Sequence, residues 1–347
     1  MAPKAVQSAL RLLTRGPQIP ALERCVSNVT PPQRAHVFAE LRERLVMEYL
    51  TRTPSAVRAV DLLSARGARI HNDHVALRSF AANGTSGLTF LGEIFTSFGY
   101  AAQAPVTIPG LAVNARWFEP PEITDWPKIF ISELRADELP AEASEIVQRH
   151  VGNYYDSSAA LKAQSMGDAS ALVDLLETPP WRVSAEEEMK VRAVGVADPK
   201  LAGAAEYAAW TLTHAHRWNH LTILLNGANL PGVSTLADLN ALLQAEDFTF
   251  NRAGGADGLT QGSVAVKLEQ SSTKADLVQH TFSCGTSREV PCAFLELIHR
   301  HEGFRGFLGS NAKGIFSSTS STPSSRLELP SMVLPQAPGS QPTQPRA

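Results

Sequence analysis

The chain is poor in cysteine. Only three cysteines occur among 347 residues, and no two of them stand in a Cys-x-x-Cys pair. An odd, sparse set argues against a disulfide framework and against a structural zinc ribbon, since both need closely spaced cysteines. We therefore expect a reducing compartment. Cys284 and Cys292 are predicted to flank a hairpin turn and to pack as ordinary apolar residues.

Long runs of like charge and long apolar runs are also missing. The 31 basic and 34 acidic residues give a formal net charge of −3 and are interspersed, which leaves no general footprint for nucleic acid. No apolar stretch approaches the ~20 residues that a membrane span needs. We therefore expect neither a nucleic-acid partner nor a membrane-spanning segment, while an acidic small-molecule substrate remains open. With 44% hydrophobic residues, the chain can bury a sizeable core.

The two ends of the chain differ in composition from the middle. Residues 1–22 carry Lys4, Arg11 and Arg15 but no acidic residue, which is typical of an organelle transit peptide and equally of a frayed N-terminal helix. The C-terminal end is rich in Ser, Pro and Gln, a composition typical of disorder. We predict an N-terminal extension over 1–30, a single domain over 31–318 and a disordered tail over 319–347.

Hydrophobic periodicity predicts helices and strands in mixed order. Helices are expected at 34–50, 54–67, 86–98, 140–178, 184–192, 200–214 and 234–244. Strands are expected at 74–80, 106–118, 128–134, 219–225, 263–271, 276–283 and 291–298. No unit of 20–50 residues repeats. The sequence therefore predicts an α+β protein whose strands are separated by long helical insertions.

Two of the ten histidines share a matching context. His74 lies in NDHVAL and His220 in WNHLTI, so each follows a polar doublet at the start of an apolar strand. A lone histidine is more often a satisfied polar residue than a metal ligand, but a repeated context favours ligands. Three other histidines remain weaker candidates, for a ligand, a helix cap or a supporting role: His71, His214 and His216.

Glu296 is the carboxylate that completes a metal site. It lies inside the apolar run PCAFLELI, where an unpaired carboxylate would cost several kcal/mol to bury. Two histidines and one carboxylate from separate strands form the facial triad of non-haem iron(II) oxygenases, which leaves positions open for substrate and dioxygen. The alternative is that Glu296 faces solvent on an edge strand.

Five segments in the same order resemble one known family. The chain resembles the iron-dependent 2-oxoadipate dioxygenase/decarboxylase family, also called hydroxyglutarate synthase, over roughly residues 35–320. The segments that carry the resemblance are NDHVALRSF, WNHLTILL, LEQSSTKAD, PCAFLELIHR and GFRGFLGSNAKGIFSST. The resemblance implies a vicinal oxygen chelate-like β core, in which paired βαβββ modules surround one metal, with large helical insertions.

The family's functional residues can be carried over by position. The resemblance implies Fe(2+) as the cofactor, with His74, His220 and Glu296 as its ligands. Arg78 matches the arginine that contacts the substrate's carboxylate. It shares a strand face with His74, and its planar guanidinium suits a carboxylate; the alternative is a salt bridge at the rim. Three residues either line the pocket or form a polar strand edge: Gln270, Ser271 and Ser272.

The resemblance implies a specific reaction. A dioxygenase/decarboxylase of this type converts 2-oxoadipate, a 2-oxo dicarboxylic acid, and O2 to 2-hydroxyglutarate and CO2 in lysine catabolism. The plant and algal members imply a plastid location, with the cytoplasm or mitochondrion as alternatives. Two other functions stay open: a redox-neutral metalloenzyme that uses Zn(II) or Mn(II), and a non-catalytic binding protein of plastid carbon or starch metabolism.

Overall fold

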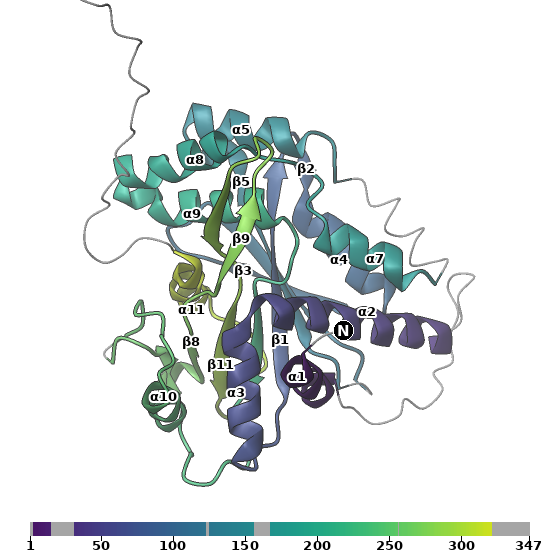
Figure 1. Cartoon of the computed structure of the whole chain (residues 1–347), viewed down its shortest axis with the longest axis vertical. Coiled ribbons are helices and arrows are strands. Elements are labelled where there is room, and N and C mark those ends of the chain that lie inside the picture. Colours follow the sequence, from purple (N-terminus) through teal and green to yellow (C-terminus); the bar gives the residue numbers. More distant parts are fainter. Residues whose placement is uncertain (1–2, 15–30, 123–124, 156–166, 256, 321–347) are drawn as a thin grey trace, which may run out of the picture.

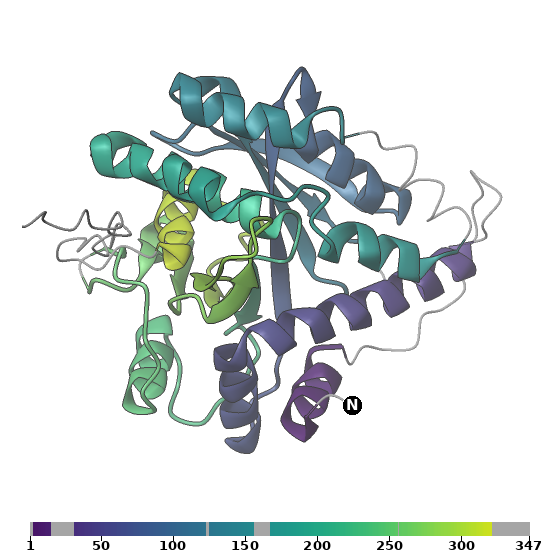
Figure 2. The ribbon, with the colours of Figure 1, turned by 45° about the horizontal axis from the view of Figure 1, so that its top comes forward.

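One mixed sheet forms the centre of the protein, with helices on both of its faces (Figure 1, Figure 2). The computed structural model describes residues 3–14, 31–122, 125–155, 167–255 and 257–320. The helices are α1 Lys4–Thr14, α2 Pro31–Arg52, α3 Pro54–Ala65, α4 Gly87–Ser97, α5 Ala141–Val151, α7 Ala169–Glu177, α8 Ala185–Ala197, α9 Ala202–His214, α10 Leu236–Ala245 and α11 Gly309–Phe316. The strands are β1 Asn72–Ala82, β2 Thr85–Ser86, β3 Ala101–Thr107, β4 Val113–Glu119, β5 Lys128–Arg135, β6 His220–Leu224, β7 Gln261–Ser263, β8 Leu268–Ser272, β9 Leu277–Thr281, β10 Ser287–Pro291 and β11 Phe294–Arg300.

The sheet is built from two copies of one module. Its strand order is β3-β4-β5-β1-β6-β11-β8-β7, with β2 paired to β1. In the first module β1 lies parallel to β5, and in the second β6 lies parallel to β11. The other pairs within each module are antiparallel, and β1 meets β6 antiparallel at the centre. With α4 and α10 as their helices, these are the two βαβββ modules of a vicinal oxygen chelate-like core, so the predicted fold is confirmed.

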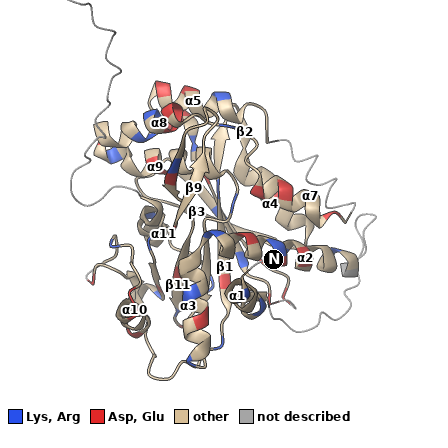
Figure 3. Ribbon diagram, in the orientation of Figure 1, with Lys and Arg blue, Asp and Glu red and all other residues tan. Residues whose placement is uncertain are grey.

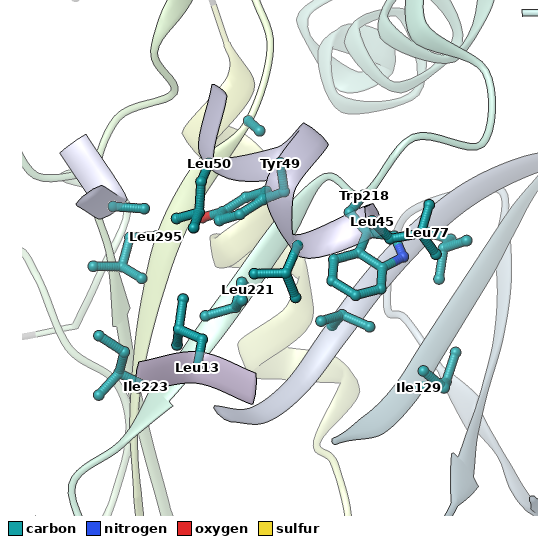
Figure 4. Close-up of a cluster of buried hydrophobic side chains, with 14 of the residues drawn as sticks. Leu13, Leu45, Tyr49, Leu50, Leu77, Ile129, Trp218, Leu221, Ile223 and Leu295 are labelled. Atoms are coloured by element: carbon teal, nitrogen blue, oxygen red, sulfur yellow. The ribbon is translucent and has the colours of Figure 1, made fainter. Parts of the chain in front are cut away.

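The two faces of the sheet carry different side chains, because neighbouring residues of a strand point to opposite sides. On one face Val75 and Leu77 belong to a large apolar cluster that is covered by α1, α2, α3, α4, α7 and α10. Figure 4 shows Leu45 and Tyr49 of α2 packed near Leu221 of β6. On the other face lie α5, α8, α9 and the end of α11. The first face carries the larger apolar cluster, and the second carries the smaller one together with His74 and Arg78 of β1.

Helix α1 is part of this apolar core. Its residues Val6, Ala9, Leu10 and Leu13 are buried, and the Arg42 guanidinium of α2 donates to the carbonyl of Thr14 (2.8 Å). Residues 15–30 and 321–347 lie outside the described residues, so the N-terminal extension and the disordered tail stay predictions. Residues 4–14, however, pack as a structural element rather than as a loose end.

Three predicted elements were wrong because turns interrupt them. The strand expected at 106–118 is two strands, β3 and β4, separated by a turn at Pro109-Gly110 with φ +71° at the glycine. The strand expected at 263–271 is split by a short 3₁₀-helix, Val264–Val266, and by Lys267 in the left-handed region. The helix expected at 140–178 begins as α5, which ends at Val151 before Gly152 with φ +50°. A second helix, α7, begins at Ala169, and residues 156–166 of the predicted helix lie outside the described residues.

The cysteine-bearing hairpin also differs from its prediction. Strand β10 was not expected, and it pairs antiparallel with β9. Cys284 lies exposed in the turn between them, so its predicted packing role is wrong, whereas Cys292 is buried as expected. The strand expected at 291–298 is split, because β10 ends at Pro291 and β11 begins at Phe294.

Charges follow the pattern read from the sequence. Figure 3 shows basic and acidic residues mixed along helices such as α2 and α8. None of the described helices combines the length and the apolar character that crossing a membrane requires.

Replacing Leu13 with Ala tests the contribution of α1. Leu13 is only 7% exposed, so L13A should lower the free energy of unfolding by about 2–5 kcal/mol, as is usual for buried leucines. The control is Arg11→Ala on the exposed side of the same helix, expected to change it by less than about 0.5 kcal/mol. Urea denaturation measures both. Equal, small effects would show that α1 does not support the fold.

Candidate metal centre

Three adjacent strands bring His74, His220 and Glu296 together. In the central antiparallel pair, Ala76 of β1 lies opposite His220 of β6. In the parallel pair beside it, Thr222 lies opposite Glu296 of β11. Because alternate residues share a face, these registers place the two imidazoles and the carboxylate on one side of the sheet, at its centre.

The three side chains converge on one point. Glu296 Oε1 lies 3.6 Å from Nε2 of His74, and Oε2 lies 3.1 Å from Nε2 of His220. Their ligand atoms all lie within 4.8 Å of one another, and each residue is at most 3% exposed. The structure thus brings all three predicted ligands together, and Glu296 does not face solvent on an edge strand.

The residue before each histidine holds its ring. His74 Nδ1 donates to the Asp73 carboxylate (2.9 Å), and His220 Nδ1 donates to the side-chain oxygen of Asn219 (2.8 Å). An imidazole that donates through Nδ1 has its Nε2 lone pair free to bind a cation. Both rings are therefore oriented as metal ligands, each by its immediate neighbour in the sequence.

A further layer of polar contacts supports the triad. Arg300 of β11 holds the Asp73 carboxylate through two hydrogen bonds (2.8 and 2.7 Å). On the other side, the Gln270 amide of β8 donates to Glu296 Oε1 (2.7 Å), and Asn311 of α11 donates to Gln270 (3.0 Å). Such contacts fix ligand orientation and raise metal affinity.

The charges at the centre favour a cation. Burial alone would raise the pKa of Glu296, but the two facing imidazoles hold it well below its usual range. Burial likewise works to lower the pKa of His74, yet the Glu296 and Asp73 carboxylates outweigh it and leave that pKa raised. For His220 burial prevails, and its pKa is lowered. An ionised carboxylate between two imidazoles is the donor set of a facial triad.

The centre opens into a small covered cavity. Its volume is about 20 Å³, enough for about one water molecule. The residues that line it are His74, Phe130, His220, Gln270, Glu296, Phe307, Leu308, Ala312, Ile315 and Phe316. The Phe307 ring meets His74 edge-on at 4.8 Å between centroids. The cover over the triad therefore comes from residues 307–316, at the C-terminal end of the described chain.

Arg78 lies one layer behind the cavity wall. It is 1% exposed, so the alternative of a rim salt bridge is wrong. Its guanidinium donates to the Glu206 carboxylate (3.3 and 3.4 Å), to the Phe316 carbonyl (3.2 Å) and to the Thr319 hydroxyl (3.1 Å). Phe316 also lines the cavity, so Arg78 contacts a residue of the cavity wall.

The weaker candidates lie elsewhere. His214 ends α9 and donates to the Pro291 carbonyl (2.9 Å), and His216 is buried against Tyr154, with ring centroids 5.7 Å apart. Ser271 donates to Asn240 of α10. Ser272 shares a hydrogen bond with Ser318. Of the three polar residues on β8, only Gln270 contacts the triad, through Glu296. His71 precedes β1 and is not part of the triad.

Sequence reasoning missed the supporting residues, although one signal was present. Asp73 and Asn219 were noticed only as polar neighbours, and their shared place directly before a histidine is the signal of a ring acceptor. Arg300 and Asn311 carry no local signal, because their partners are distant in the sequence.

Comparison with known proteins agrees with this architecture. A family model described as 2-oxoadipate dioxygenase/decarboxylase matches residues 39–300. The rice (Oryza sativa subsp. japonica) 2-oxoadipate dioxygenase/decarboxylase, named chloroplastic/amyloplastic, is 29% identical over 298 residues, covering 78% of this chain and 76% of that protein.

Two solved structures are similar in fold. The rice hydroxyglutarate synthase in complex with 2-oxoadipate has a TM-score of 0.68 at 26% identity, covering 88% of this chain and 98% of that one. A glyoxalase-superfamily protein from Ralstonia eutropha has a TM-score of 0.63 at 18% identity, covering 89% of this chain and 99% of that one, a likeness of fold alone. With the family model matching well over half of its length, the chain belongs to the 2-oxoadipate dioxygenase/decarboxylase family of oxidoreductases.

Proposed function

We propose that the protein converts 2-oxoadipate and O2 to 2-hydroxyglutarate and CO2, with Fe(2+) held by His74, His220 and Glu296. One observation carries the proposal most: two Nε2 atoms and one carboxylate converge in a buried centre. The equation balances without a cosubstrate, because both oxygen atoms of O2 enter the products. Oxidative decarboxylation supplies two of the four electrons that O2 takes up, and hydroxylation of a C–H bond of the shortened acid supplies the other two. Family membership supports the same reaction, which we place in lysine catabolism.

The donor set fits iron. Two imidazoles and a carboxylate are the protein ligands of non-haem Fe(II) oxygenases, which keep further coordination positions open. When bound, the metal supplies those positions and activates O2 beside the 2-oxo acid. The protein's own share is to hold the ligands rigid through Asp73, Asn219 and Gln270. The apolar cover formed by residues 307–316 excludes bulk water, which protects reactive species from side reactions.

We propose that Arg78 binds the distal carboxylate of the substrate. It shares a strand face with His74, and its Nε atom is buried without a hydrogen-bond partner, so a carboxylate could gain a contact there. The substrate would replace the contacts of Arg78 to Phe316 and Thr319. A six-carbon diacid exceeds a cavity of about 20 Å³, so the cover has to move aside on binding.

Replacing Glu296 with Gln tests the metal site. E296Q keeps the shape but removes the buried charge, so iron affinity and turnover should both fall by more than about 100-fold, beyond what supporting contacts are worth. The control is Glu289→Gln, an exposed position on β10. Anaerobic iron loading, oxygen uptake and product mass give the readouts. Unchanged oxygen uptake in E296Q, or product formation without oxygen uptake in the native protein, would contradict the proposal.

Substrate pairs test Arg78. Arg78→Met should lower kcat/KM for 2-oxoadipate by about 10²–10³-fold, the scale of a lost buried charge pair, yet hardly affect 2-oxohexanoate, which ends in a methyl group. Because R78M leaves Glu206 without its cation, the double variant R78M/E206Q provides a charge-balanced control for folding. An equal loss with both substrates would assign Arg78 a purely structural role.

We further propose a plastid location, on the basis of the chloroplastic/amyloplastic name of the rice relative and the basic, acid-poor residues 1–22. A fluorescent protein fused after residue 347 of the full chain should report from chloroplasts of leaf cells. A cytosolic or mitochondrial signal from the same fusion would contradict this location.

A further inference from the structure

A second group of potential metal ligands lies on the opposite face of the same sheet. Glu269 of β8 pairs across the strands with His299 of β11, and His301 follows two residues later. His299 is three positions beyond Glu296, so the two side chains point to opposite faces. Among the described residues, this group and the triad are the two sets of three donors whose ligand atoms lie within 4.8 Å of one another.

The two imidazoles approach one carboxylate oxygen. His301 Nε2 lies 2.8 Å from Glu269 Oε2, and His299 Nδ1 lies 3.8 Å from the same atom. The ring centroids of the two histidines are 4.2 Å apart. The donor types therefore repeat those of the triad, although none of the three residues takes part in it.

One donor of this group has no partner in the protein. His299 Nδ1 is a buried atom without a hydrogen bond, and 3.8 Å is too long for one to Glu269. A buried polar atom without a partner is destabilising unless a ligand satisfies it. Burial lowers the pKa of His299, which favours the neutral ring that a metal requires.

The group is also accessible. The side chains are 20%, 18% and 17% exposed for Glu269, His299 and His301, so water can complete the coordination of an ion. The buried Nδ1 atom of His299 has to turn outward to bind one. Tetrahedral Zn²⁺ accepts His nitrogen and carboxylate oxygen at roughly 2.0–2.2 Å. Small side-chain rotations would draw these three donors to such distances.

We propose that Glu269, His299 and His301 form a second metal site, which binds Zn²⁺ or a similar imidazole-preferring divalent ion with water as a further ligand. The site would tie β8 to β11. On the opposite face of the sheet, the same two strands carry Gln270 and the triad residue Glu296. A second ion would therefore stabilise the strand pair that positions Glu296.

Zinc stoichiometry tests the proposal on the full chain. Metal-free protein titrated with Zn²⁺ alone in a calorimeter should bind two equivalents. His301→Ala and His74→Ala should each bind one, and the double variant none. His36→Ala, an exposed histidine on α2, serves as a matched control that should keep both equivalents.

His301→Ala could lose the second equivalent simply because it misfolds, and Glu269→Gln serves as a second variant that removes a ligand charge without changing the side-chain shape. It should weaken the second equivalent by at least about 100-fold with an unchanged circular-dichroism spectrum. A single equivalent in the native protein, or two in both H301A and E269Q, would overturn the second site. The outcome is separable from the proposed function, because both variants leave the triad intact and iron-dependent oxygen uptake is measured independently.

Discussion

The buried charge of Glu296 is the constraint on which the rest of the centre depends. A carboxylate with 1% exposure is tolerated only when it is paired and hydrogen-bonded. Two imidazoles and the Gln270 amide meet that need. These partners need support in turn: Asp73 accepts a hydrogen bond from His74, and Arg300 holds Asp73 through two further hydrogen bonds. The polar contacts form one connected network, and its rigidity comes from the strands that carry it.

The sheet separates this network from the apolar core. On one face, β1, β6 and β11 pack against α1, α2 and α3. On the other, the same strands hold ligands beneath a cover from residues 307–316. The packed face fixes ligand positions, whereas the cover is held by side-chain contacts such as Asn311 to Gln270. A rigid floor with a separate cover suits a site that binds a small molecule away from water.

The sequence predicted the triad because His74 and His220 share a context at the start of apolar strands and Glu296 interrupts an apolar run, patterns that a single chain displays directly. It predicted most elements for the same reason, and failed where a glycine or a left-handed residue such as Lys267 broke a run. The setting of Arg78 was beyond reach, since Glu206 and Thr319 approach it only through tertiary packing. The repeat of the two modules was implied only by the family resemblance, because insertions of different length separate equivalent strands.

The two modules differ at one position beside the metal centre, on the last strand of each module. In the first module Ala76, two positions after His74, pairs with Phe130 of the last strand. In the second module Thr222, two positions after His220, pairs with Glu296 of the last strand. Phe130 lines the cavity but offers no donor atom. A pair of carboxylates there would enclose the centre symmetrically with four protein ligands. The broken symmetry of this duplicated fold leaves one side of the centre without a protein ligand, and an aromatic ring lies where the other module places its carboxylate.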